Sequence, residues 1–150
     1  MNVIFLDFNG VLDTYENIDE INEENLQRLK YIVEETNAKV VISSSLKNSY
    51  YYTGHFSQHL QNIIRKIENT GIQIVGITPQ AKNREEEIIL YLKEHPEVDN
   101  YCILDDDYEM QELKDNLVKL PSQMNKNQKG LEDVYMNMAI DILNRNRKIK

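Results

Sequence analysis

The stretch VIFLDFNGVL, residues 3–12, contains the pattern around which the rest of the chain is organised. Residues 3–6 are continuously apolar, and Asp7 follows them at once. A short apolar run of this kind is typical of a strand buried on both faces. Residues 40–42 repeat the pattern before three serines, and residues 101–104 repeat it before three aspartates. The chain is therefore predicted to contain several buried strands with polar groups at their carboxyl ends.

Helical stretches separate the predicted strands. Asn22, Ser57 and Asn83 are placed to cap helices, and Gly130 precedes a last helix. Residues 72–77 form a third predicted strand, and residues 117–120 are a candidate for a short fifth one. Because apolar strands alternate with helices, we predict a three-layer α/β domain with a central, mostly parallel sheet.

The composition is that of one globular domain. A chain of 150 residues leaves no room for two cores, so we predict a single domain over residues 1–144 and a basic tail over residues 145–150. A net charge of −8 argues against a broad nucleic-acid-binding surface. The apolar run at residues 3–6 is too short for a signal peptide or a membrane span, so a cytoplasmic protein without membrane contact is expected. Cys102, the single cysteine, excludes an internal disulfide.

The polar groups at the strand ends indicate where a ligand binds. In open parallel sheets, ligands bind beyond the carboxyl ends of the strands, which is where Asp7, the serines at 43–45 and the aspartates at 105–107 are expected to meet. Carboxylates gathered at one place repel each other unless a cation lies between them, and their oxygen atoms suit Mg²⁺. Hydroxyl groups beside that cation can hold an anion. The combination indicates phosphoryl chemistry.

These strand ends resemble motifs of the haloacid dehalogenase (HAD) superfamily. DFNGVL at residues 7–12 resembles motif I, D-x-D-G-[TV]-L; ISSS at residues 42–45 resembles motif II; ILDD at residues 103–106 resembles motif IV. The chain is also similar to small HAD domains such as those of Swiss-army-knife RNA repair proteins, which read S-S-S-W-R at the position of residues 43–47 and have a late Gly-Leu, here Gly130-Leu131. The resemblance implies a Rossmann-like HAD fold.

The same resemblance implies a Mg²⁺-dependent phosphatase that hydrolyses a phosphomonoester through a covalent aspartyl-phosphate. Asp7 would be the nucleophile. Mg²⁺ would be held by the Asp7 carboxylate, by the main-chain carbonyl of Asn9 and by Asp105 or Asp106. The phosphorylated substrate would be a nucleotide, a nucleic-acid end or another phosphoester.

The phosphate would be held by hydroxyl groups and a cation. Ser43 would hydrogen-bond a phosphoryl oxygen with the amide of Ser44 nearby, and these two roles are uncertain in register by one residue. The motif III cation would be Lys82 or Arg84, and the resemblance favours Arg84, with Lys47 as a supplementary contact. The alternative is that Lys82 and Arg84 are solvated residues at a helix start that pair with the glutamates following them.

Asn9 is the departure from the family pattern. HAD phosphatases have an aspartate there, which protonates the leaving group and then activates water, whereas an amide does neither. General acid–base catalysis typically contributes a factor of about 10²–10⁴, so activity is expected to be impaired. The enzyme is slow or uses another acid, for which Asp13 and Asp107 are candidates by position; or the chain is a non-catalytic phosphate-binding or interaction domain; or Asn9 is an engineered change.

The segments around the motifs predict an open site. Neither the stretch after motif I nor the stretch after the third strand is long enough for a large cap domain, so a loop at residues 47–56 would be the only lid. The tyrosines at residues 50–52 would either stack on a base or sugar or pack on the domain. His55 and His59 are predicted to be surface residues.

Overall fold

Five strands form one sheet in the computed structural model, which describes residues 1–106 and 109–145. The sheet order is β3-β2-β1-β4-β5, and each neighbouring pair is parallel. The predicted α/β class with a parallel sheet is therefore confirmed. The strands are β1 (Asn2–Leu6), β2 (Lys39–Ile42), β3 (Ile74–Ile77), β4 (Asn100–Asp105) and β5 (Leu117–Lys119).

The helices begin where the sequence places their caps. The side chains of Asn22, Ser57 and Asn83 each accept a hydrogen bond from a backbone N–H in the first turn, which satisfies a donor that the helix itself cannot pair. The α-helices are α1 (Glu23–Thr36), α2 (Asn48–Thr53), α3 (Gln58–Glu68), α4 (Arg84–Glu94) and α5 (Asp133–Leu143), and short 3₁₀ turns occur at η1 (Ser45–Lys47) and η2 (Lys114–Asn116).

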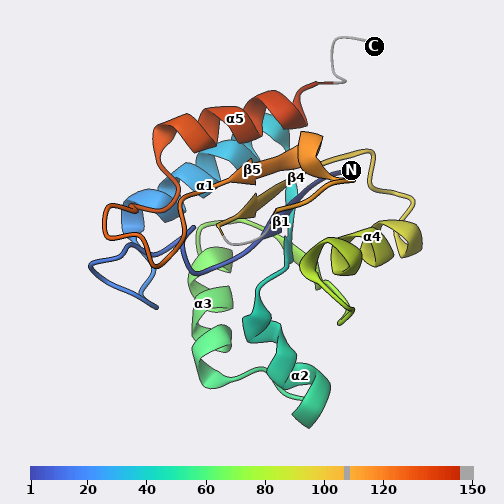
Figure 1. Cartoon of the computed structure of the whole chain (residues 1–150), viewed down its shortest axis with the longest axis horizontal. Helices are drawn as coiled ribbons and strands as arrows, with labels where there is room; N and C mark the ends of the chain where they lie inside the picture. The colour runs from blue at the N-terminus through green and yellow to red at the C-terminus, as the bar shows by residue number, and fades with distance from the viewer. Residues whose placement is uncertain (107–108, 146–150) are drawn as a thin grey trace.

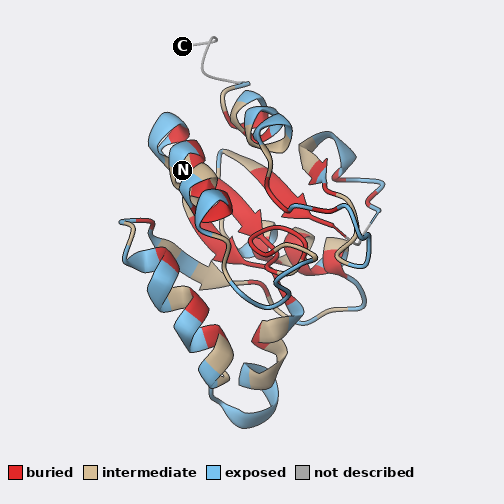
Figure 2. Cartoon of the chain, turned by 90° about the vertical axis from the view of Figure 1, so that its left-hand side faces the viewer, coloured by how far each residue is buried: buried red, intermediate tan, exposed pale blue. Residues whose placement is uncertain are grey.

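The helices form two layers around the sheet (Figure 1). Alternate residues of each central strand point to opposite faces, so Ile4 packs with α1, α3 and α5, whereas Phe5 packs with α4. The central strands β1, β2 and β4 are largely buried on both faces, whereas the edge strands β3 and β5 and the outer sides of the helices are partly exposed (Figure 2). This burial explains why the strands read as continuous apolar runs. The predicted three-layer arrangement is confirmed.

The segment at residues 47–56 differs from its prediction as a loop. Residue 47 is the end of η1, and residues 48–53 form α2, a six-residue helix with no buried residue. The prediction was wrong because α2 lacks an apolar face whose spacing could reveal it. No cap domain is inserted between β1 and α1 or between β3 and α4 in the described part of the chain, as expected.

Part of the sequence prediction lies outside the described residues. Arg147, Lys148 and Lys150 of the proposed tail belong there, as does Asp107, the candidate acid. Arg145 is described, and its guanidinium donates a hydrogen bond to the main-chain carbonyl of Asp115 (3.0 Å). Among the described helices, none has both the length and the apolar composition needed to cross a membrane.

Candidate active site

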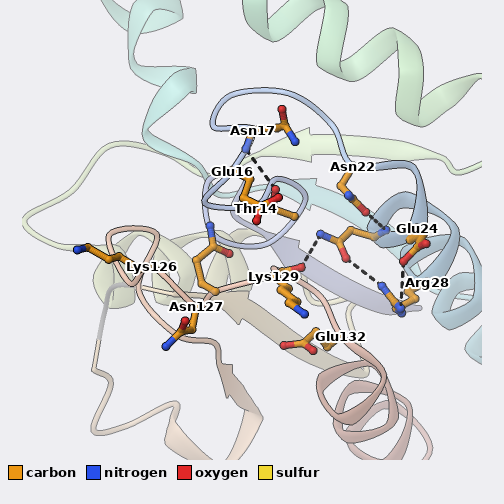
Figure 3. A pocket seen from close by; sticks show the side chains of 12 residues that line it. Thr14, Glu16, Asn17, Asn22, Glu24, Arg28, Lys126, Asn127, Lys129 and Glu132 are labelled. Carbon is orange, nitrogen blue, oxygen red and sulfur yellow. Dashed lines mark hydrogen bonds and ion pairs between the residues drawn. The ribbon is translucent and has the colours of Figure 1, made fainter.

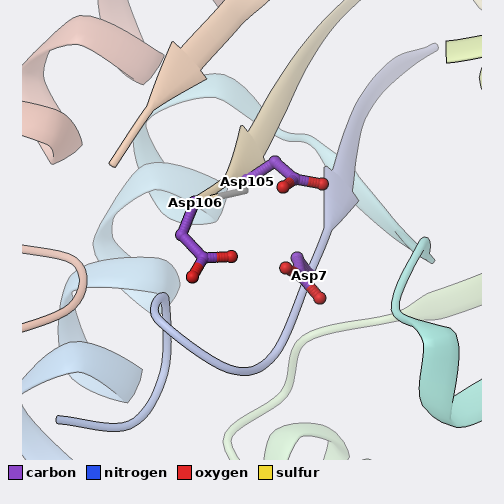
Figure 4. A group of neighbouring side chains, drawn as sticks. All are labelled: Asp7, Asp105 and Asp106. Carbon is purple, nitrogen blue, oxygen red and sulfur yellow. The ribbon is translucent and has the colours of Figure 1, made fainter. Parts of the chain in front are cut away.

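The carboxyl ends of β1 and β4 bring three acids together. The parallel register pairs Leu6 with Leu104, so Asp7 lies beside Asp105, and Asp106 follows directly. All three are buried, and one carboxylate oxygen from each lies within 4.8 Å of the others (Figure 4). Two adjacent central strands thus place the acids of motifs I and IV in one cluster, which we call the acidic cluster.

The acidic cluster is electrostatically strained without a cation. Burial raises the pKa of Asp7 well above its usual value, and the charge of Asp105 raises it further, while Arg84 acts in the opposite direction. A cation among the carboxylates would offset both the desolvation and the repulsion. Because the donors are hard oxygen atoms, the residues fit a hard divalent cation. Asp7, Asp105 and Asp106 could therefore hold a metal ion.

Gly10 allows the acidic cluster to close. Its φ of +81° lies in the left-handed region, and a Cβ at this position would overlap the Asp106 carboxylate. Asp106 in turn accepts a hydrogen bond from the backbone N–H of Gln123 (2.6 Å). The motif I glycine is therefore required both by the turn and by the close approach of an acid from the neighbouring strand.

Arg84 is the motif III candidate that reaches the cluster. It is the first residue of α4 and is buried, with Nη1 at 2.9 Å from Asp105 Oδ2 and 3.7 Å from Asp7 Oδ1. Its Nη2 donates to the Ser45 hydroxyl (3.1 Å). Lys82, by contrast, is exposed. A cation at a helix N-terminus is unfavourable by itself, and here the acids offset that cost. The alternative was wrong in making Arg84 solvated, although Arg84 does lie 3.7 Å from Glu87, and it fits exposed Lys82.

Behind Arg84 lies a buried ion pair between Lys47 and Glu87. Lys47 Nζ donates to Glu87 Oε1 (3.0 Å), and Arg84 Nε lies 3.7 Å from the same oxygen. Burial lowers the pKa of Lys47, whereas the hydrogen bond to Glu87 opposes that shift. The sequence offered Glu87 only as a partner of a solvated Arg84 and not as a buried residue, although its position one helical turn after Arg84 was a usable signal. It placed Ser45 among the serines after the second strand but gave it no role of its own.

The serines after β2 differ in their surroundings. Ser43 is fully buried, its backbone N–H donates to Leu6 O (2.9 Å), and its hydroxyl has no hydrogen-bond partner among the described residues. The Ser44 hydroxyl accepts from the N–H of Leu46 (3.2 Å), so it caps η1. A cavity of about 200 Å³ opens beside these groups, lined by Asp7, Asn9, Ser44, Ser45, Leu46, Arg84 and Gln123.

The amide nitrogen of Asn9 is bonded to two acids outside the acidic cluster. Nδ2 donates to Asp13 Oδ2 and to Asp19 Oδ1, both at 2.8 Å. Asp13 is fully buried and also accepts hydrogen bonds from the N–H groups of Gly10 and Asp19. Both amide hydrogens of Asn9 are thus engaged, and Asp13 holds the turn of motif I together.

The aromatic segment after η1 partly packs on the domain. The Tyr51 hydroxyl donates to Thr78 O (2.8 Å), whereas Tyr52 is 80% exposed. Tyr51 therefore packs on the domain, and stacking of a tyrosine on a base or sugar stays a prediction. His55 is exposed as predicted, but His59 is half-buried with its ring edge-on to Phe8 (5.9 Å between centroids), so its prediction as a surface residue was wrong.

A second cavity, of about 850 Å³, lies between the loops that follow β1 and β5 (Figure 3). The Arg28 side chain at its edge is held by Asp133 (2.8 Å) and by the side chain of Asn25 (3.1 Å). No residue of the predicted site lines this cavity. All the residues that line it are polar or charged in type: Thr14, Glu16, Asn17, Asn22, Glu24, Asn25, Arg28, Lys126, Asn127, Gln128, Lys129 and Glu132.

A comparison with protein families agrees with the motifs and the geometry. The family model described as "HAD domain in Swiss Army Knife RNA repair proteins" matches residues 3–131. This range runs from β1 to the residues before α5 and contains every residue of the acidic cluster and of the surrounding cavity. A search of curated proteins and a search of solved structures gave no match.

Proposed function

The chain belongs to the family of HAD domains in Swiss Army Knife RNA repair proteins, and from this premise we propose that it is a Mg²⁺-dependent phosphohydrolase. Most members of the HAD superfamily are phosphohydrolases. The observation that carries the proposal is the buried cluster of Asp7, Asp105 and Asp106 with Arg84 beside it. This arrangement offers a nucleophile, a cation site and a phosphate contact within one cavity.

Asp7 is the proposed nucleophile. A carboxylate oxygen would attack the phosphorus of a phosphomonoester, so that the bond to the ester oxygen breaks and an aspartyl-phosphate forms. The departing oxygen takes up a proton from solvent, since the Asn9 amide does not supply one. Water then attacks the phosphorus and gives up a proton to solvent, and the bond between phosphorus and the Asp7 oxygen breaks, which releases inorganic phosphate and restores the Asp7 carboxylate. The backbone N–H of Phe8 donates to Asp7 Oδ1 (2.8 Å) and so fixes the carboxylate.

The phosphoryl oxygens would be held by Arg84 and by the serines after β2. Arg84 lines the cavity with Nη1 3.7 Å from Asp7 Oδ1, and Ser43 has a hydroxyl with no partner among the described residues. Ser44 lines the cavity. Lys47 is proposed from the sequence as a supplementary contact, whereas exposed Lys82 has no support from the structure.

Mg²⁺ is the proposed metal. The carboxylates of Asp7, Asp105 and Asp106 and the main-chain carbonyl of Asn9 would hold it. When bound, it supplies positive charge that offsets the charge of the phosphoryl oxygens.

A non-catalytic phosphate-binding domain is the second candidate function. Asn9 favours it, because the position that supplies a proton in HAD phosphatases has an amide whose hydrogens are bonded to Asp13 and Asp19. Asp7, the acid of motif I that the chain retains, favours the enzyme. Both candidates share the same phosphate site, so turnover separates them.

The proposed substrate is a phosphorylated nucleotide or nucleic-acid end. The name of the family supports this class, and the lack of a cap domain over the described site would admit a bulky phosphoester. A net charge of −8 limits the contact with nucleic acid to a terminus rather than a long strand.

Hydrolysis of an aryl phosphate by the wild type and by Asp7→Asn tests the proposal. The substitution keeps the shape of the side chain and removes the nucleophile, so the expected result is Mg²⁺-dependent release of phosphate by the wild type alone. Oligonucleotides phosphorylated at the 5′ or the 3′ end then test the substrate class. Equal turnover by Asp7→Asn would contradict the nucleophile, and phosphate binding without turnover would favour the second candidate.

A further inference from the structure

The place of Lys47 is unusual for a residue expected to contact phosphate. Its side chain is 1% exposed, and the residues lining the site cavity include its neighbour Leu46 but not Lys47. Its ammonium group instead donates to Glu87 at 3.0 Å. A lysine is rarely buried without a specific partner, because removing the ammonium charge from water is costly. The structure therefore suggests that the charge of Lys47 acts on Glu87.

Glu87 is held from three directions. One carboxylate oxygen takes the hydrogen bond from Lys47 and lies 3.7 Å from Arg84 Nε. The other accepts from the backbone N–H of Ala81 (3.4 Å). The Glu87 carboxylate thus lies near Nε of Arg84, while Nη1 and Nη2 of the same guanidinium donate hydrogen bonds to Asp105 and Ser45.

The strength of the attraction between Glu87 and Arg84 depends on Lys47. With Lys47 in place, the charge of Glu87 is already compensated. Without Lys47, a buried carboxylate would lack that compensation, and Arg84 is the cation nearest to it. A closer ion pair with Arg84 would relieve that cost. The guanidinium would then turn away from Asp7 and from the phosphate that it is proposed to bind.

Resting on the proposed function, we infer that Lys47 and Glu87 form a positioning pair: Lys47 neutralises Glu87, so that Arg84 stays directed at the phosphoryl group. Lys47 then acts through two other side chains and does not touch the substrate. This inference replaces the supplementary phosphate contact expected from the sequence. It predicts that removing Glu87 restores the phosphate binding that is lost when Lys47 is removed. A direct contact between Lys47 and phosphate would not predict this.

The test compares Lys47→Met, Glu87→Gln and the double variant. Methionine keeps most of the lysine volume without its charge, and glutamine keeps an acceptor for Ala81. For each variant, kcat and KM with an aryl phosphate, the Kd of inorganic phosphate in the presence of Mg²⁺ and the Tm are measured. Lys47→Met is expected to weaken phosphate binding and kcat/KM by roughly tenfold, and the double variant to return to within about threefold of Glu87→Gln, because the two residues are coupled.

Two matched controls accompany this cycle. Glu86→Gln removes the neighbouring exposed carboxylate on α4 and should leave kcat, KM and phosphate binding unchanged. Lys47→Arg keeps the charge and should preserve most of the activity. If the Tm shows that Lys47→Met does not fold, Lys47→Arg takes its place in the cycle. The double variant of Lys47→Arg and Glu87→Gln should then match Glu87→Gln alone in kcat, KM and phosphate binding.

Two results would overturn the positioning pair. If the double variant binds phosphate as weakly as Lys47→Met, Lys47 contacts the phosphate itself and the positioning pair is wrong. Unchanged phosphate binding in folded Lys47→Met would also contradict it. Because phosphate binding is measured without turnover, an inactive wild type would overturn the proposed enzyme but would still leave this cycle decisive.

Discussion

The two sides of the site cavity are built in different ways. On one side, the acidic cluster comes from residues directly at the ends of two paired strands, so the register of β1 with β4 places Asp7 beside Asp105. On the other side, Arg84 and Glu87 lie one turn apart on α4, and Lys47 at the end of η1 meets Glu87 only through a contact between their side chains. Backbone pairing positions the acids, whereas a charge network positions the cations.

The two sides also complement each other in charge. The three ionised acids of the cluster carry three negative charges, while Lys47, Arg84 and Glu87 together carry one net positive charge. A divalent cation would therefore neutralise the whole buried group. A divalent cation would thus remove the excess negative charge that would otherwise repel an anion from this site.

The largest effect on catalysis is expected from removing Arg84, which should change turnover without weakening the binding of Mg²⁺. Arg84→Ala is expected to lower kcat by about 10²–10³, the usual cost of losing a preorganised donor at a developing charge. The acidic cluster is intact in this variant, so the Kd of Mg²⁺, measured by calorimetry, should stay the same or decrease. Arg65→Ala, which removes an exposed arginine on α3, is the control. A parallel loss of Mg²⁺ affinity would show that the two sides are not independent.

A smaller effect is expected at Asn9, on the acidic side. Asn9→Asp should raise kcat by roughly tenfold, because it restores a group that transfers protons. The new carboxylate would face Asp13 and Asp19, however, where the amide now donates two hydrogen bonds. Adding Asp19→Asn should therefore raise kcat further and recover stability lost in the single variant.

The outcome for these two variants is read from steady-state kinetics and thermal unfolding. Intact-mass analysis is needed throughout, since the pair Asn9-Gly10 is prone to deamidation. Unchanged turnover in both variants would mean that the amide is not what limits catalysis.

The contrast between the two sides also explains what the sequence could reveal. The apolar runs, the caps at Asn22, Ser57 and Asn83 and the acids of the cluster follow from local patterns and from the geometry of parallel sheets. The burial of Lys47 and its pairing with Glu87 do not, because those residues are 40 positions apart and meet only in the folded chain.

Two smaller differences have the same origin. The contact of Asn9 with Asp19 depends on a loop whose conformation no periodicity predicts. Likewise, α2 was missed because a short polar helix has no apolar stripe. The sequence thus predicted the residues fixed by the backbone better than those fixed by side-chain pairing.

The last effect concerns stability rather than turnover and belongs to the acidic side alone. Because the pKa of Asp7 lies above its usual value of 3.8 in the folded, metal-free protein, Asp7 retains its proton in the folded state at pH values where it has lost it in the unfolded state. The contribution of Asp7 to the free energy of unfolding without metal should therefore fall as the pH rises from near 4 through the raised pKa. Asp7→Asn removes the titrating group and should flatten this dependence.

Mg²⁺ should reverse that trend, because it binds the deprotonated carboxylates of the folded state. At about 100 times its Kd it would add about 2.7 kcal/mol to the free energy of unfolding, and less at a pH where Asp7 is protonated. Thermal unfolding with EDTA and with Mg²⁺, at about pH 4.5 and about pH 7.5, measures both effects. A Mg²⁺ stabilisation that is equal at the two pH values, or equal in Asp7→Asn, would place the cation away from Asp7 and would leave the acidic cluster without its proposed ligand.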